Sequence, residues 1–193
     1  GIEVIVCDRP NPLGGVVVEG NVVHPGFESF VGAYPLAVRH ALTIGEVARF
    51  LNATQKWQAK LTIVELQNWR REQLYPTTGG LWSQPSPNMP TFDTTVVYPG
   101  TCLFEATNVS EGRGTTRPFE IIGAPFVDPK EYAAALNAQK LPGVYFRPLY
   151  FKPTFHKFKD EACGGVFVHV TDVTVFESFY TGLAMVKTAH DLY

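Results

Sequence analysis

The chain has 193 residues, of which 45% are hydrophobic and 18% charged, and its formal net charge is −2. A domain of this size can bury roughly 70% of the surface that its unfolded chain exposes, so its stability requires neither a metal nor a disulfide. The nearly neutral charge argues against a nucleic-acid partner, and no segment approaches the roughly 20 apolar residues of a membrane span.

The first half of the chain predicts two strands and one helix. Residues 2–7 are a continuous apolar run, typical of a buried strand in a parallel sheet, and residues 60–66 predict a second strand. Thr43-Ile-Gly-Glu46 matches a capping box, so a helix is expected from about 43 to 52. Its expected buried face consists of Ile44, Val47, Ala48 and Leu51. A strand at residue 2 needs a pairing partner, so we expect the chain to begin inside a larger protein.

The second half has a more regular pattern, interrupted by one long segment. It predicts a helix from Thr91 to Tyr98 stopped by Pro99-Gly100, a helix from Asp128 to about Gln139, strands at 144–151 and 166–171, and a helix capped by Thr174 that ends near residue 190. The last helix is expected to bury Phe176, Phe179, Tyr180 and Leu183. Residues 101–127 show neither the hydrophobic periodicity of a helix nor that of a strand. Long irregular segments of this kind inside compact domains are usually functional. The element order predicts a mixed α/β fold.

Residues 105–119 hold the densest set of polar groups. Glu105 and Glu111 supply two carboxylates, Arg113 and Arg117 supply two guanidinium groups, and Asn108 adds an amide. The guanidinium group of arginine pairs well with a planar carboxylate, which makes this segment a candidate binding or catalytic site. The alternative is a polar surface turn whose charges pair with one another, and the sequence alone does not separate the two.

Two further segments are candidates for ligand contacts. Prolines stiffen residues 85–91, so Asn88 would be held at little entropic cost, although the segment could also be a rigid connector. Asp8, Arg9 and Asn11 directly follow the first strand, where ligands bind in open α/β sheets, although Asp8 and Arg9 could form an internal salt bridge instead.

Cofactor and metal motifs are missing from the sequence. The five histidines show no metal-ligand spacing, and no glycine-rich stretch fits a nucleotide, so we expect neither a metal nor a cofactor. The odd number of cysteines excludes a complete disulfide framework, although Cys102 and Cys163 could pair in an oxidising compartment.

Four long motifs together resemble one known family. They are Asp8-Arg-Pro-Asn-Pro-Leu-Gly-Gly, Pro85-Ser-Pro-Asn-Met-Pro-Thr, Tyr98-Pro-Gly-Thr-Cys-Leu-Phe-Glu and Thr107-Asn-Val-Ser-Glu-Gly-Arg-Gly-Thr-Thr-Arg-Pro-Phe. They resemble the NamZ-type exo-β-N-acetylmuramidases, formerly a domain family of unknown function. The resemblance implies a bacterial, extracytoplasmic hydrolase that releases N-acetylmuramic acid from the non-reducing ends of peptidoglycan fragments.

The same resemblance implies a domain organisation. The chain is similar to the C-terminal half of the family and lacks the Pro-Glu-His-Gly motif, whose glutamate is a leading catalytic candidate. Residues 1–20 are then the end of a truncated N-terminal Rossmann-like domain. Residues 21–193 are expected to form a C-terminal α+β domain of mixed sheet and helices with long irregular loops. The missing N-terminal domain is an expected partner.

These expectations combine into a functional hypothesis. The chain supplies mainly substrate recognition for a peptidoglycan-derived glycan or muropeptide, with Glu111 and Glu105 as catalytic candidates. Arg113 or Arg117 would clamp the lactyl carboxylate that distinguishes muramic acid from glucosamine. The remaining substrate-binding candidates are Asp8, Arg9, Asn11, Asn88 and Asn108. The chief alternative is a non-catalytic glycan-binding or domain-pairing module, and a weaker one is a small-molecule hydrolase that uses Glu111 and a histidine.

Overall fold

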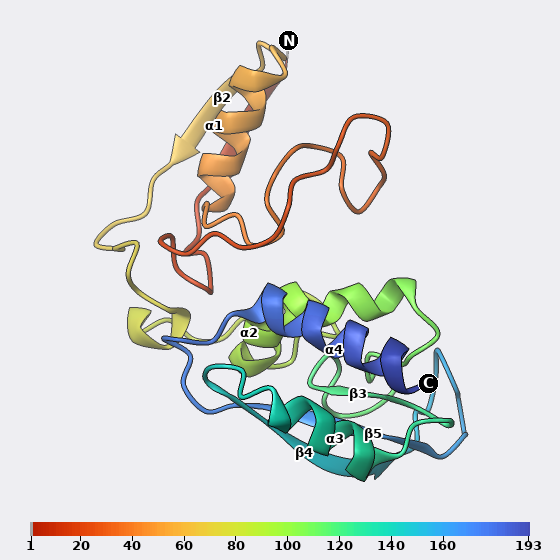
Figure 1. Ribbon diagram of the computed structural model, residues 1–193. Helices are drawn as coiled ribbons and strands as arrows, with labels where there is room; N and C mark the ends of the chain where they lie inside the picture. Colours follow the sequence, from red (N-terminus) through yellow and green to blue (C-terminus); the bar gives the residue numbers. More distant parts are fainter. Residues whose placement is uncertain (1) are drawn as a thin grey trace. The chain divides into compact units, whose positions relative to one another are not determined.

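The computed structural model describes residues 2–193, and the chain divides into two compact units (Figure 1). The first unit is Gly1–Trp82 and the second is Ser83–Tyr193. From the sequence, a domain boundary was expected after residue 20. Instead, the first strand pairs with a strand near residue 60, so residues on both sides of the expected boundary belong to one unit.

The first unit contains a small parallel sheet with one helix against it. Its elements are β1 (Glu3–Cys7), α1 (Ile44–Thr54), β2 (Lys60–Val64) and the 3₁₀ helix η1 (Tyr75–Thr78). β1 and β2 pair in parallel from Glu3↔Lys60 to Cys7↔Val64, which confirms both predicted strands. The predicted burial of the first strand is wrong: α1 packs on this two-stranded sheet, but the side chain of Ile5 is 62% exposed.

Helix α1 begins with the predicted capping box, and an aspartate reinforces it. The Thr43 hydroxyl accepts from the Glu46 N–H, and the Glu46 carboxylate accepts from the Thr43 N–H. Asp8 accepts from the Gly45 N–H and the Thr43 hydroxyl, each at 2.8 Å. A Cβ atom at residue 45 would lie 2.8 Å from Asp8 Cγ, so glycine permits this approach. The helix therefore buries Gly45 and leaves Ile44 exposed, contrary to the predicted face.

The second unit is built around a three-stranded antiparallel sheet of order β3-β5-β4. Its elements are α2 (Phe92–Thr101), the 3₁₀ helix η2 (Cys102–Ala106), β3 (Ile121–Ala124), α3 (Pro129–Ala138), β4 (Val144–Phe151), β5 (Cys163–Val170) and α4 (Ser178–Leu192). Helix α3 packs on β4 and β5, and the Tyr132 hydroxyl of α3 donates to the Met185 carbonyl of α4. Buried Phe146, Val166 and Val168 form the centre of this core. The predicted α+β class is confirmed.

Helices α2 and α4 lie side by side, and their contact corrects two predictions (Figure 1). α2 continues through Pro99 to Thr101, although proline was expected to end it. In α4, Tyr180 and Leu183 are exposed, whereas the predicted face should have buried them. The helix instead buries small or slender side chains: Ser178, Thr181, Gly182, Met185, Thr188 and Ala189. Close approach of two helices favours such residues over large ones.

Two local turns also differ from the prediction. Thr174 does not cap α4; its hydroxyl donates to Asp172 Oδ1 at 2.6 Å, and the helix begins only at Ser178. Strand β5 begins at Cys163, earlier than expected, because Gly164 and Gly165 pair with Ala124 and Gly123 of β3. All three cysteines are free, so the possible pairing of Cys102 and Cys163 is not formed.

The glycine contact between α2 and α4 generates a first prediction. A Cβ atom at Gly182 would clash with the backbone of Gly100, so Gly182→Ala should lower the free energy of unfolding by about 2 kcal/mol. At an exposed helical position, the same substitution would instead stabilise the protein by about 1 kcal/mol. Urea unfolding measures the difference, with Leu183→Ala as an exposed control on the same helix. A Gly182→Ala variant as stable as the parent would contradict this packing.

Candidate functional site

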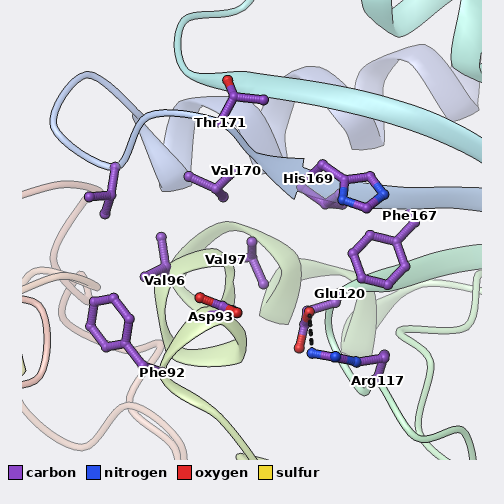
Figure 2. A pocket seen from close by; sticks show the side chains of 12 residues that line it. Phe92, Asp93, Val96, Val97, Arg117, Glu120, Phe167, His169, Val170 and Thr171 are labelled. Carbon is purple, nitrogen blue, oxygen red and sulfur yellow. Dashed lines mark hydrogen bonds and ion pairs between the residues drawn. The ribbon is translucent and has the colours of Figure 1, made fainter. Parts of the chain in front are cut away.

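A cavity of about 470 Å³ lies within the second unit, between α2 and the C-terminal end of β5 (Figure 2). Asp93, Val96 and Val97 of α2 line one side, and Phe167 and His169 of β5 line the other. Glu120 and Arg117 complete the wall next to Phe167. Small-molecule sites usually enclose roughly 300–1,000 Å³ and combine apolar walls with a few polar groups, as this cavity does.

Glu120 is the buried acid of this cavity. Its side chain is 4% exposed, and its Oε1 accepts from the Thr94 hydroxyl at 2.6 Å. Burial is the main cause that raises the pKa of Glu120, and the nearby charge of Asp93 raises it further. The hydrogen bond from Thr94 and the charge of Arg117 oppose this shift without cancelling it. Glu120 therefore keeps its proton to a higher pH than an exposed glutamate.

Local backbone geometry places the Glu120 carboxyl. Phe119 has a φ of +64° and its N–H donates to the Glu111 carbonyl at 2.6 Å, which turns the chain directly before Glu120. The Glu120 carbonyl then accepts from the Val168 N–H of β5. On the opposite side, the Thr91 hydroxyl caps α2 and fixes the helical turn that contains Thr94. Both partners of the short hydrogen bond are thus held by the backbone.

Arg117 contributes the exposed cation of the cavity. Its side chain is 44% exposed, and its Nη1 lies 3.4 Å from Glu120 Oε2. Charge-assisted N–H···O bonds are usually about 2.7–2.9 Å long, so this ion pair is loose. Arg117 was a predicted substrate-binding residue, and a loosely held guanidinium group on a cavity wall can pair with a second anion.

His169 is held beside the same cavity by two neighbours. Its ring stacks on Phe167 with centroids 4.2 Å apart, and its Nε2 accepts from Arg147 Nε at 3.1 Å. Burial lowers the pKa of His169, and the charge of Arg147 lowers it further. The imidazole is therefore neutral at neutral pH and presents a flat, uncharged face.

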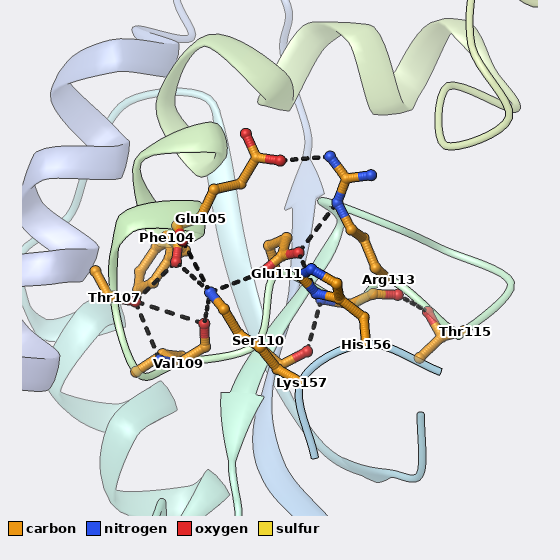
Figure 3. A network of polar contacts seen from close by, with 11 residues as sticks. Phe104, Glu105, Thr107, Val109, Ser110, Glu111, Arg113, Thr115, His156 and Lys157 are labelled. Carbon is orange, nitrogen blue, oxygen red and sulfur yellow. Dashed lines mark hydrogen bonds and ion pairs between the residues drawn. The ribbon is translucent and has the colours of Figure 1, made fainter. Parts of the chain in front are cut away.

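Two residues of the predicted segment 105–119, Glu111 and Arg113, form an ion cluster with His156 and Lys157 (Figure 3). Glu111 is 0% exposed. Its Oε1 lies 3.1 Å from Arg113 Nε and 3.2 Å from His156 Nδ1, and its Oε2 lies 3.1 Å from Lys157 Nζ. Oε1 and Arg113 Nε meet as an ion pair without hydrogen-bond geometry. Glu105 pairs with the outer side of Arg113.

Lys157 connects this cluster to the backbone. Its ammonium group donates to the Phe104 carbonyl at 2.7 Å and the Val109 carbonyl at 3.1 Å, besides Glu111 (Figure 3). A lysine that bonds backbone carbonyls on both sides of a loop fixes the path of that loop. The geometry favours internal charge pairing over an open site, and the catalytic role expected for Glu111 and Glu105 stays a prediction.

The other predicted site residues have varied surroundings. Asp8 caps α1, as described above, and Asn11 donates to the Leu42 carbonyl at 2.9 Å, so both support the loop after β1. The side chain of Arg9 is exposed. In the second unit, Asn88 is half-buried, and exposed Asn108 lines a separate cavity of about 330 Å³. The structure thus gathers Glu105, Glu111 and Arg113 in one cluster and places Arg117 on the cavity wall.

Three residues that line the cavity were not among those predicted from the sequence: Asp93, Glu120 and His169. One signal was present: Arg117 and Glu120 are three residues apart in a segment already rich in charge. Within residues 2–193, no group of three or more His, Cys, Asp or Glu side chains is placed to hold a metal ion. None of the helices in this described part of the chain is long and apolar enough to cross a membrane.

The ion cluster generates a second prediction. Glu111→Gln leaves Lys157 and Arg113 without their buried counter-charge, so the free energy of unfolding should fall by about 3 kcal/mol. Glu105→Gln removes only a partly exposed pair and should cost less than about 1 kcal/mol. Denaturant unfolding of both variants tests this difference. A Glu111→Gln variant with parental stability and no activity would support a catalytic role instead.

Comparisons with known proteins identify the relatives of the chain. Residues 96–193 match the family model described as exo-β-N-acetylmuramidase NamZ, C-terminal, and residues 1–93 match the corresponding N-terminal model. The chain is 49% identical over 193 residues to the peptidoglycan β-N-acetylmuramidase NamZ of Bacillus subtilis (strain 168), a match that covers 100% of the chain and 47% of that protein.

Two crystal structures of DUF1343 family proteins from Bacteroides fragilis NCTC 9343 share the fold. One is 36% identical with a TM-score of 0.92 and covers 99% of this chain and 50% of that protein. The other is 26% identical with a TM-score of 0.71 and covers 98% of this chain and 51% of that protein. The chain thus spans about half the length of the relatives that it matches.

The matches correct one expectation and establish the family. The chain was expected to correspond to the C-terminal half of the family. That expectation is wrong, because residues 1–93 match the N-terminal model. Together the two models account for nearly every residue, and the chain belongs to the NamZ family of exo-β-N-acetylmuramidases.

Proposed function

We propose that the chain is part of a peptidoglycan glycosidase that releases N-acetylmuramic acid from the non-reducing ends of cell-wall fragments, outside the bacterial cytoplasm. The observation that carries this proposal is its 49% identity, over its whole length, to a protein named peptidoglycan β-N-acetylmuramidase. The chain covers 47% of that protein.

Substrate recognition is the role that the cavity supports best. Muramic acid differs from glucosamine by a lactyl group that ends in a carboxylate. Arg117 is the exposed cation on the cavity wall, whereas Arg113 is engaged by Glu105 and Glu111. Of the two arginines singled out in the sequence, Arg117 is therefore the one that can bind the lactyl carboxylate without dismantling an ion cluster.

Glu120 is the carboxyl in the cavity that can hold a proton. Glycosidic bond cleavage usually needs an acid that donates a proton to the leaving oxygen, and such acids have raised pKa values. Burial raises the pKa of Glu120, and its side chain lines the cavity, whereas Glu111 is enclosed by its ion partners. Glu120 thus replaces Glu111 as the carboxyl of this chain best placed to serve as an acid.

The alternative of a non-catalytic glycan-binding module is favoured by one observation. Both carboxylates first expected to be catalytic are engaged by cations: Glu111 lies inside the ion cluster, and Glu105 pairs with the outer side of Arg113. The Glu120→Gln variant distinguishes the two functions. If the chain is a non-catalytic binding module, the variant should keep its affinity for sugar, and the parent protein should show no hydrolysis. A glycosidase that uses Glu120 as its acid would retain binding and lose turnover.

The role of Arg117 generates a third prediction. In the purified full-length protein, Arg117→Ala should reduce the preference for a chromogenic muramic acid glycoside over the matching glucosamine glycoside by about 10- to 100-fold in kcat/KM, the usual effect of losing a charged hydrogen bond. Arg117→Lys keeps the charge without the two-pronged geometry, so it should restore part of the preference. An unchanged preference in Arg117→Ala would refute the assignment.

The raised pKa of Glu120 generates a fourth prediction, about stability. A carboxyl with a higher pKa in the folded state binds more protons there than in the unfolded state, so stability decreases as pH rises from the ordinary value near 4.5 through the folded pKa. Glu120→Gln has no titrating carboxyl and should flatten this decrease. Urea unfolding between pH 4 and 8 measures the slope, with exposed Asp191→Asn as the control. Equal slopes in Glu120→Gln and the parent would contradict the shift.

A further inference from the structure

The face of the sheet next to the cavity carries four side chains that form one surface. The register of β4 and β5 places Tyr145 opposite His169 and Arg147 opposite Phe167. Directly opposite residues of an antiparallel pair lie on the same face of the sheet. We call this surface the platform; it consists of Tyr145, Arg147, Phe167 and His169. The alternate residues of the same strands, such as Phe146, are buried in the core.

The platform is held in place by contacts among its own members. His169 stacks on Phe167 with an angle of 24° between the rings, and the Arg147 guanidinium lies over the Phe167 ring at 5.5 Å. Arg147 Nε also donates to His169 Nε2, which uses one of the five N–H donors of the arginine. Because these side chains are already held in place before binding, they lose little conformational entropy when a ligand binds.

The platform is continuous with the cavity. Phe167 and His169 line the cavity wall beside Glu120 and Arg117 (Figure 2), and their cross-strand partners on β4 extend the same face outside it. Tyr145 is 52% exposed, so its ring is accessible. A ligand whose end occupies the cavity would therefore continue over Phe167 onto Arg147 and Tyr145.

The chemistry of this surface suits a sugar ring. The C–H face of a pyranose packs on aromatic rings, and its hydroxyl and acetamido oxygens accept hydrogen bonds from an arginine or a tyrosine hydroxyl. We propose that the platform binds the second ring of an amino-sugar chain whose terminal ring occupies the cavity. This inference rests on the proposed function and adds a subsite for the leaving part of the glycan.

Titration calorimetry with two sugars tests the platform. The ligands are N-acetylmuramic acid and an S-linked disaccharide of N-acetylmuramic acid and N-acetylglucosamine, which the protein does not hydrolyse. The full-length protein should bind the disaccharide about tenfold more tightly than the monosaccharide. Arg147→Ala and Tyr145→Ala should each remove most of this advantage. Tyr145→Ala should also leave the affinity for the monosaccharide within about twofold, because Tyr145 does not line the cavity, whereas Arg147 holds His169 at the cavity wall.

The matched control lies on the same strand. Tyr150 is 74% exposed but alternates to the opposite face of β4, so Tyr150→Ala should change neither affinity. Equal binding of the two sugars by the parent protein, or an undiminished disaccharide advantage in both platform variants, would overturn the platform and leave the proposed function intact. Binding of neither sugar by the parent protein would overturn both.

Discussion

A carboxylate with no exposure to solvent, Glu111, holds the irregular middle of the second unit together. Burying a charge is costly unless it is paired, and here Lys157, Arg113 and His156 surround it. Lys157 also bonds backbone carbonyls of the loop that leads to Glu111. Residues 102–119, which contain little regular structure, are thereby given a defined path.

That path determines what faces the cavity. After Arg113 the chain runs away from the ion cluster, and it turns at Phe119. Arg117, before this turn, and Glu120, directly after it, both line the cavity between α2 and β5. The two arginines of one short motif thus have different surroundings, one inside the ion cluster and one on the cavity wall. The same motif stabilises the fold and supplies the polar groups of the proposed sugar site.

Local signals in the sequence predicted much of the fold. The capping box at Thr43, the helix α3 that follows Asp128 and the strands β1, β2 and β4 all depend on neighbouring residues, and all are confirmed. The predictions failed where residues that are distant in sequence determine which side chains are buried. The buried face of α4 depends on the approach of Gly100 to Gly182, and such a contact between helices leaves no pattern within either helix.

The candidate site shows the same limit. Charge density singled out residues 105–119 as a candidate site, and Arg117, which lines the cavity, was among the predicted residues. Sequence alone could not separate an enclosed carboxylate from one in a cavity, because Lys157 and His156 reach Glu111 from a loop more than 40 residues away. Glu120 was overlooked because its burial depends on α2 and β5, which are distant in sequence.

The crystal structure of the full-length protein with bound N-acetylmuramic acid would show whether Arg117 recognises the sugar. We expect the sugar ring in the cavity, with its lactyl carboxylate about 2.7–2.9 Å from the guanidinium group of Arg117. We also expect an intact ion cluster around Glu111 in the same structure. A sugar bound against Arg113, with Glu111 freed from Lys157 and facing the glycosidic oxygen, would contradict both expectations.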